Sequence, residues 1–241
     1  MANPYFQFKQ FTVYHDRCAM KVTTDCCVFG AWVAGDMGRE ERKITTALDI
    51  GSGTGLLSLM IAQKNDLDID AVEIDKEASL QSQENIAASP WKDRIQVENE
   101  DARQFRGVSK YDCIVSNPPF YENELTSERK TKNIAHHSEE LRLPELLKVV
   151  KMNLEEGGLF YLMFPFKRRR ELEQLLREND LYTEDVVLLS QSLEHAPFRV
   201  IVKGSNVKGE PGESISISVW DEEQQYTKAF VDLLKDYYLY L

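Results

Sequence analysis

The chain has 241 residues, 42% of them hydrophobic, and a formal net charge of −11. Its length suits one large α/β domain, and its acidity argues against generic polyanion binding, because phosphate contacts need Lys and Arg. No apolar run approaches the roughly 20 residues that span a membrane and the four cysteines lack metal-site spacing, so we expect a monomeric cytoplasmic protein without a metal.

The first 43 residues precede the first strong strand pattern. Apolar and polar residues alternate partly over 6–13, which favours a short β-ribbon. Asp25 is placed to cap a helix over 26–34. We expect residues 1–43 to form a cover over the opening of one Rossmann-like domain, residues 44–241.

From residue 44 onward, buried strands alternate with helices. Strands are predicted at 46–50, 69–74, 95–98, 111–116 and 159–164, and helices at 56–64, 76–88 and 141–154. A helix over 168–178, closing strands at 186–189, 198–202 and 215–220, and an amphipathic tail follow. This order indicates βαβ units, so the expected fold class is α/β with a doubly wound, mostly parallel sheet.

A glycine-rich turn, Asp49-Ile50-Gly51-Ser52-Gly53-Thr54-Gly55, joins the first of these strands to its helix. Glycines let the backbone turn tightly and approach a ligand closely, and the helix N-terminus offers free N–H groups. A nicotinamide-binding turn needs a third glycine where the chain has Leu56. The spacing of Gly51, Gly53 and Gly55 instead resembles the first motif of methyltransferases that use S-adenosylmethionine.

Two acids follow the next two strands. Glu73 ends the second strand, where a carboxylate can accept hydrogen bonds from both hydroxyls of a ribose. Asp101 follows the third strand, where methyltransferases of this type place an acid near the adenine amino group. Both are therefore candidate cofactor-binding residues.

The fourth strand ends in Asn117-Pro118-Pro119-Phe120. Two prolines stiffen the turn, because they fix φ and donate no N–H group. The four residues resemble the signature of methyltransferases that act on a planar amino nitrogen, either adenine N6 or a glutamine amide. Asn117 and the Pro118 carbonyl can accept both N–H groups, and Phe120 can stack on a base, so these three are the candidate catalytic residues.

Motifs across nearly the whole chain resemble the bacterial tRNA1(Val) (adenine(37)-N6)-methyltransferases. They are Phe8–Phe11, Asp16–Val22, Thr24-Asp25, Gly30–Trp32, Leu48–Leu56, Ala71–Asp75, Ser89–Trp91, Asn117–Tyr121 and Leu233–Tyr238. The resemblance implies a seven-stranded class I methyltransferase sheet and methylation of adenine 37 in tRNA. It also implies that S-adenosylmethionine is the cofactor and S-adenosylhomocysteine the product, and that Thr24, Asp25, Asp49 and Asn117 help to bind the cofactor.

The acidic total charge requires a local basic surface for an RNA substrate. We expect one face to carry the pocket, Tyr121 and the basic residues Lys9, Arg17, Lys21, Arg129, Lys130, Lys132 and Lys167–Arg170, with Arg168 and Arg169 central.

The residues leave several activities open. The same turn serves N6-adenine methylation of ribosomal RNA or DNA and N5-methylation of a protein glutamine. A noncatalytic RNA-binding module is the alternative of a different class. The intact glycine turn, Glu73 and Asn117 argue against this last alternative, since such a module needs no transfer site.

Overall fold

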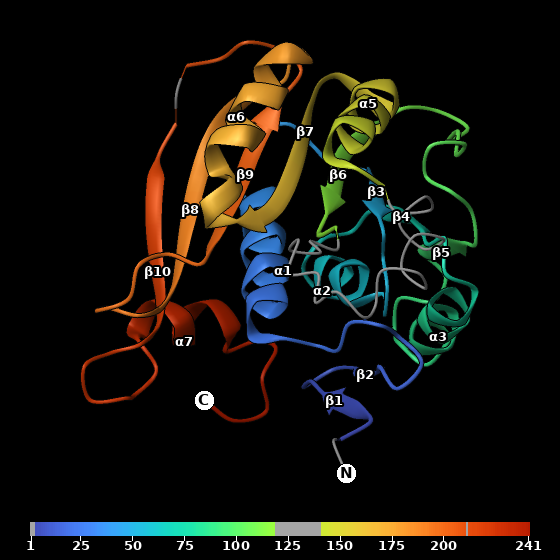
Figure 1. Ribbon diagram of the computed structural model, residues 1–241. Helices are drawn as coiled ribbons and strands as arrows, with labels where there is room; N and C mark the ends of the chain where they lie inside the picture. Colours follow the sequence, from blue (N-terminus) through green and yellow to red (C-terminus); the bar gives the residue numbers. More distant parts are fainter. Residues whose placement is uncertain (1–2, 119–140, 211) are drawn as a thin grey trace, which may run out of the picture.

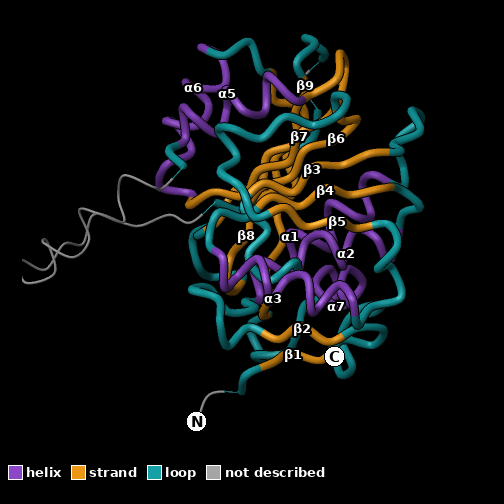
Figure 2. The backbone as a smooth tube through the Cα atoms, turned by 90° about the vertical axis from the view of Figure 1, so that its right-hand side faces the viewer, coloured by secondary structure: helices purple, strands orange, loops and turns teal. Residues whose placement is uncertain are grey.

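The computed structural model describes residues 3–118, 141–210 and 212–241, whose centre is an eight-stranded sheet with helices on both faces (Figures 1 and 2). Its strands are β3 (Thr46–Ile50), β4 (Asp68–Val72), β5 (Ile95–Glu98), β6 (Tyr111–Ser116), β7 (Leu154–Pro165), β8 (Tyr182–Ser192), β9 (Arg199–Ser205) and β10 (Ser214–Trp220). The helices are α1 (Thr24–Met37), α2 (Leu56–Lys64), α3 (Lys76–Ala87), α5 (Leu143–Asn153), α6 (Arg169–Glu178) and α7 (Lys228–Leu234). A 3-10 turn, Phe166–Arg168, precedes α6. None of these described helices is long and apolar enough to cross a membrane.

The strand order is β10-β8-β9-β7-β6-β3-β4-β5. Strands β5, β4, β3, β6 and β7 are parallel, whereas β9 runs antiparallel to both β7 and β8. The predicted α/β class and mostly parallel sheet are confirmed. The predicted count of seven strands is wrong, because β10 adds a parallel edge beside β8 and buries Ile217 and Val219.

Two hydrophobic cores sandwich the sheet. One lies under α1, α2, α7 and the N-terminal segment, and the other under α5 and α6. The predicted range of α2, 56–64, is confirmed to the residue. Gly55 marks the start of the helix as its N-cap, and no glycine interrupts the helix after it. The predicted strands 95–98 and 111–116 are confirmed as well.

The N-terminal segment packs on the chain's other end. Its predicted ribbon exists as β1 (Tyr5–Gln7) and β2 (Thr12–Tyr14), which pair antiparallel. Phe8 bridges to Tyr238, and the hydroxyl of Tyr237 donates to the Met60 carbonyl in α2 at 2.9 Å. Residues of the N-terminal segment thus share one core with α2 and α7, and the division of the chain at residue 43 remains a prediction.

The first helix differs from the prediction in length and in its cap. It spans Thr24–Met37, its N-cap is Thr23, and Asp25 lies inside the first turn. The expected capping role of Asp25 is wrong, because its buried carboxylate accepts from Arg199 Nε of β9 at 2.8 Å.

A second set of ion pairs ties the other end of α1 to the same strand. Lys203 of β9 is 8% exposed at its side chain and lies 3.0 Å from Asp36 Oδ2 and 2.5 Å from Glu40 Oε1. The hydroxyl of Tyr161 in β7 donates to Asp36 at 2.8 Å. Asp185 Oδ2 also lies 3.7 Å from the ammonium, so one buried cation neutralises several carboxylates.

We expect Lys203→Met to lower the free energy of unfolding by about 3–5 kcal/mol, because removing one partner leaves buried carboxylates uncompensated. Urea denaturation measures this change. The matched control is Lys228→Met, which breaks an exposed pair with Asp232 on α7 and should leave the free energy of unfolding nearly unchanged. Equal losses in the two variants would contradict the assigned role of Lys203.

Candidate active site

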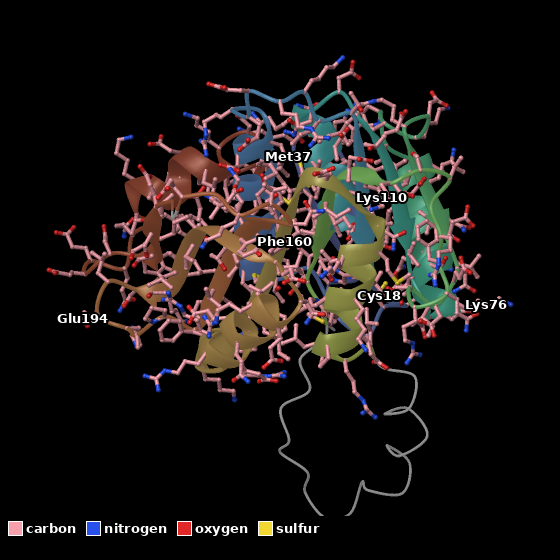
Figure 3. The ribbon with its side chains drawn as sticks, turned by 90° about the horizontal axis from the view of Figure 1, so that it is seen from above. Cys18, Met37, Lys76, Lys110, Phe160 and Glu194 are labelled. Carbon is pink, nitrogen blue, oxygen red and sulfur yellow. The ribbon has the colours of Figure 1, made fainter. Side chains whose placement is uncertain are left out.

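A cavity of about 640 Å³ opens at the carboxyl ends of the central parallel strands. Its floor is the glycine turn after β3, and its walls include the ends of β4 and β6 and the segment 18–22. Cys18 and Lys76, which both line it, lie on one side of the molecule in Figure 3, far from Glu194. Ligands of α/β sheets bind at this edge, where the strand order reverses between neighbouring strands.

The glycine turn adopts backbone conformations that only glycine tolerates well. Gly51, Gly53 and Gly55 have φ of 73°, 54° and 79°. A Cβ at Gly51 or Gly53 would meet no atom within 4 Å, so their backbones face open space. At Gly55 it would lie 2.6 Å from the Ser82 hydroxyl, so this glycine serves packing against α3.

Glu73 stands at the end of β4 beside this turn. Its carboxylate accepts from the backbone N–H of Gly53 and of Asp75, both at 2.9 Å. Burial raises the pKa of Glu73, and the two backbone donors oppose that shift. Each oxygen keeps a free lone pair, so the carboxylate can still accept bonds from two hydroxyls.

Asp101 also lines the cavity. Arg103 donates to it through Nε, 2.9 Å from both carboxylate oxygens, and through Nη2, 2.7 Å from Oδ2. These bonds lower the pKa of Asp101 and hold its carboxylate in one orientation. Ile74, which follows Glu73 and is 47% exposed, adds an apolar surface to the cavity.

Asn117 and Pro118 line the cavity at the end of β6. The preceding Ser116 hydroxyl donates to the Ile50 carbonyl at 2.7 Å, which joins β6 to the start of the glycine turn. The amide nitrogen of Asn117 lies 3.1 Å from the sulfur of Cys26 in α1. The turn that was singled out in the sequence is thus next to the glycine turn and Glu73.

Three expected cofactor contacts lie elsewhere. Thr24 and Asp25 do not line the cavity, since Asp25 is bound to Arg199. Asp49 is fully buried below the turn, where its Oδ2 accepts from Ser58 at 2.7 Å and its Oδ1 has no partner among the described residues. The carboxylates of Asp25 and Asp49 therefore stabilise the structure beneath the site, and neighbouring residues line the cavity.

Several cavity residues carry no sequence signal. Lys21 was expected near the pocket, but Cys18, Cys26 and Leu141 line the cavity although the sequence predicts none of them as a ligand contact. Their positions depend on how α1 and the N-terminal segment pack on the sheet, which a local motif does not encode.

The expected basic face is only partly assembled. Lys21 lines the cavity, and Arg17 beside it is paired with Glu84. Arg168 and Arg169 follow β7 and pair with Glu171 and Glu173 on α6. Lys9 lies in the β1–β2 turn and donates to the Lys235 carbonyl, at the end of the molecule opposite α6 (Figures 1 and 2). Phe120, Tyr121, Arg129, Lys130 and Lys132 lie outside the described residues.

The residues present fit S-adenosylmethionine. The open backbone at Gly51 and Gly53 admits close approach of a ligand, and the buried Ser52 hydroxyl, unpaired among the described residues, would gain a partner there. Glu73 has acceptors for ribose hydroxyls, and Ile74 offers an apolar surface for an adenine ring. No group of three metal-ligating residues occurs in the part of the chain that the structure describes.

Comparisons with known proteins agree with this geometry. The family model of the methyltransferase small domain matches residues 38–177. A tRNA1(Val) (adenine(37)-N6)-methyltransferase of Parabacteroides distasonis is 39% identical over 99% of both chains. Another, of Pectobacterium carotovorum subsp. carotovorum, is 38% identical over 98% of this chain and 94% of its own.

Solved structures share the fold. A predicted O-methyltransferase of Agrobacterium tumefaciens has a TM-score of 0.61 at 13% identity, over 87% of this chain and 95% of its own. The ribosomal protein L11 methylase of Lactobacillus delbrueckii subsp. bulgaricus has a TM-score of 0.53 at 19% identity, over 76% and 78%. The sheet and helices are therefore those of class I methyltransferases.

The buried Asp49 predicts a specific pH dependence of stability. Burial raises its pKa from 3.8 to about 6, so the native state holds a proton that the unfolded state releases near pH 4. Stability should therefore fall as pH rises from 4 to 7, by on the order of 2–3 kcal/mol. In Asp49→Asn this component should be absent, as measured by urea unfolding across that range. Asp66→Asn, which removes an exposed carboxylate, is the control, and parallel profiles for wild type and Asp49→Asn would refute the assignment.

Proposed function

Since the chain belongs to the methyltransferase small-domain family and, within it, to the tRNA1(Val) (adenine(37)-N6)-methyltransferases, we propose that it methylates N6 of adenine 37 in tRNA1(Val). The observation that carries this proposal is the position of Asn117 and Pro118 on the wall of a cavity whose floor is the glycine turn. When bound, S-adenosylmethionine supplies an electrophilic methyl group on a cationic sulfur. The remaining work falls to residues of the chain.

Asn117 and Pro118 orient the nucleophile. The lone pair of an exocyclic amino group is delocalised into its ring, so the nitrogen attacks poorly unless it is held. The Asn117 Oδ1 and the Pro118 carbonyl accept its two N–H groups and direct the lone pair into the cavity. A strong base is unnecessary, because the leaving group is neutral and the proton can depart after transfer.

Positioning provides much of the rate enhancement in this mechanism. Well-oriented reactants can gain on the order of 7–11 kcal/mol over free encounter. Taking adenine 37 out of its stack costs a few kcal/mol, which base stacking on an aromatic residue offsets by ~1–3 kcal/mol. We assign this stacking to Phe120, as the sequence predicts, with Tyr121 beside it.

A tRNA substrate bears on the oligomeric state, the cellular location and the RNA-binding surface of the enzyme. Such a substrate fits a monomeric cytoplasmic enzyme that presents basic residues near the cavity. Lys21 at the cavity and Arg168 and Arg169 at the end of β7 are the described residues that best fit contact with the RNA backbone. Arg168 and Arg169 pair with Glu171 and Glu173 on α6, and these pairs are exposed enough for an RNA phosphate to replace the carboxylate.

The central test is Asn117→Ala. We expect kcat for N6-methyladenosine formation to fall on the order of 10²–10³-fold, since the orienting acceptor is lost. The dissociation constant of S-adenosylmethionine should stay within about threefold, as measured by calorimetry. The control is Asn206→Ala, which removes an amide that bonds Gly157 and Glu155 at the start of β7 and does not line the cavity. This variant should leave kcat unchanged.

Nucleoside mass spectrometry identifies the product. Methylation should require adenine at position 37, so a tRNA1(Val) transcript with guanosine there is the substrate control. Undiminished turnover by Asn117→Ala would refute the mechanism. Methylation of ribosomal RNA, DNA or a protein glutamine in place of this tRNA would refute the substrate.

Charge reversal tests the RNA surface. The double variant Arg168→Glu/Arg169→Glu should weaken tRNA binding and reduce the slope of log affinity against log salt by roughly 1–2. The matched control is Lys208→Glu/Lys228→Glu, which changes the net charge equally at exposed sites remote from the cavity. Equal losses in both double variants would show a general charge effect and exclude α6 as the RNA surface.

A further inference from the structure

The sulfur of Cys26 touches the amide that the proposed function places at the transfer site. Cys26 lies in the first turn of α1, is 8% exposed and lines the cavity. Its Sγ lies 3.1 Å from Asn117 Nδ2 and 3.0 Å from the Thr23 hydroxyl. The contact joins residues 91 positions apart, so it depends on the tertiary fold.

The surroundings of this sulfur make it an acceptor. Thr23 is the N-cap of α1, and the start of a helix presents N–H groups and a partial positive charge. The hydroxyl of Thr23 also donates to the sulfur. Burial, and then Asp25, raises the pKa of Cys26 to about 11, so the group remains a neutral thiol at physiological pH. A neutral thiol is a poor nucleophile, which argues for a structural contact and against covalent chemistry.

The contact selects one of two orientations of the Asn117 amide. An asparagine side chain has a donor end and an acceptor end of nearly equal shape, and only the acceptor end can receive the N–H groups of an adenine. With Nδ2 bonded to the sulfur, Oδ1 is the end of the amide that is left to accept the N–H groups of the substrate. A flipped amide would place Oδ1 on the sulfur, where the S–H of the neutral thiol is only a weak donor, and Nδ2 would lose its bond to Sγ.

The position of the sulfur is itself fixed. Asp25, the preceding residue, accepts from Arg199 Nε at 2.8 Å and from the Cys26 backbone N–H at 3.1 Å. The first turn of α1 is therefore held to β9 next to the site. We propose that Cys26 is a positioning residue, whose sulfur accepts from Asn117 Nδ2 and keeps Oδ1 turned toward the substrate; this inference rests on the proposed function.

The experiment compares Cys26→Ala, Cys26→Ser and Cys27→Ala in the full chain. Cys26→Ala should lower kcat about three- to tenfold, the effect of one neutral hydrogen bond, with KM for tRNA and the affinity for S-adenosylmethionine within twofold of wild type. Cys26→Ser keeps an acceptor and should restore most of kcat. Cys27→Ala removes a fully buried thiol from the same turn, one that bonds Tyr238, and should leave kcat unchanged.

A second measurement does not depend on turnover. In protein labelled with ¹⁵N-asparagine, the side-chain signals of Asn117 are those missing from the Asn117→Ala spectrum. They should shift in Cys26→Ala and stay in place in Cys27→Ala, because Cys26 bonds this amide and Cys27 bonds Tyr238 instead.

The outcomes separate the two proposals. Unshifted Asn117 signals, or a kcat within twofold of wild type for Cys26→Ala, would overturn the positioning role while the proposed function stands. An equal loss of kcat in Cys27→Ala would overturn it too, because the effect would then come from packing of α1. Wild-type protein that forms no N6-methyladenosine would overturn the proposed function itself.

Discussion

The attachment of α1 to β9 is the constraint on which the site depends. Asp25 at one end of the helix pairs with Arg199, and Asp36 and Glu40 at the other end surround Lys203. Both cations belong to one short strand, so the helix is aligned along it. Each pair is buried or half-buried, and a wrong alignment would leave uncompensated charge inside the protein, which is far costlier than losing a surface pair.

This alignment puts chemistry from distant parts of the chain on one cavity. The parallel strands bring the glycine turn, Glu73 and Asn117 to a common edge, and α1 brings Cys26 across from them. Close packing helps: a Cβ at Gly30 of α1 would lie 2.7 Å from the Met60 sulfur of α2. The sheet therefore determines where the glycine turn, Glu73 and Asn117 lie. The ion pairs between α1 and β9 determine where Cys26 lies.

The sequence predicts best what is determined locally. The range of α2 and the ends of β5 and β6 are confirmed because glycine turns and apolar runs mark them, and the family, fold and cofactor follow from contiguous motifs. Asp25 was misassigned as a cap because its partner, Arg199, is 174 positions away. The contact of Cys26 with Asn117 has no local signal either. The eighth strand was visible as a pattern, but its pairing with β8 is a property of the assembled sheet.

The same distances bear on the order in which the protein can be made. Helix α1 emerges early during synthesis, and twelve of its fourteen residues are buried in the native protein. Its anchor Arg199 in β9 lies 174 positions after Asp25, and Lys203 of the same strand lies 163 positions after Glu40, which follows the helix. The bridge from Phe8 to Tyr238 forms only at the end of the chain. Contacts this distant in sequence form late. The nascent chain can therefore pack α1 on α2 soon after both emerge, but the ion pairs that align the helix can form only once most of the protein has left the ribosome.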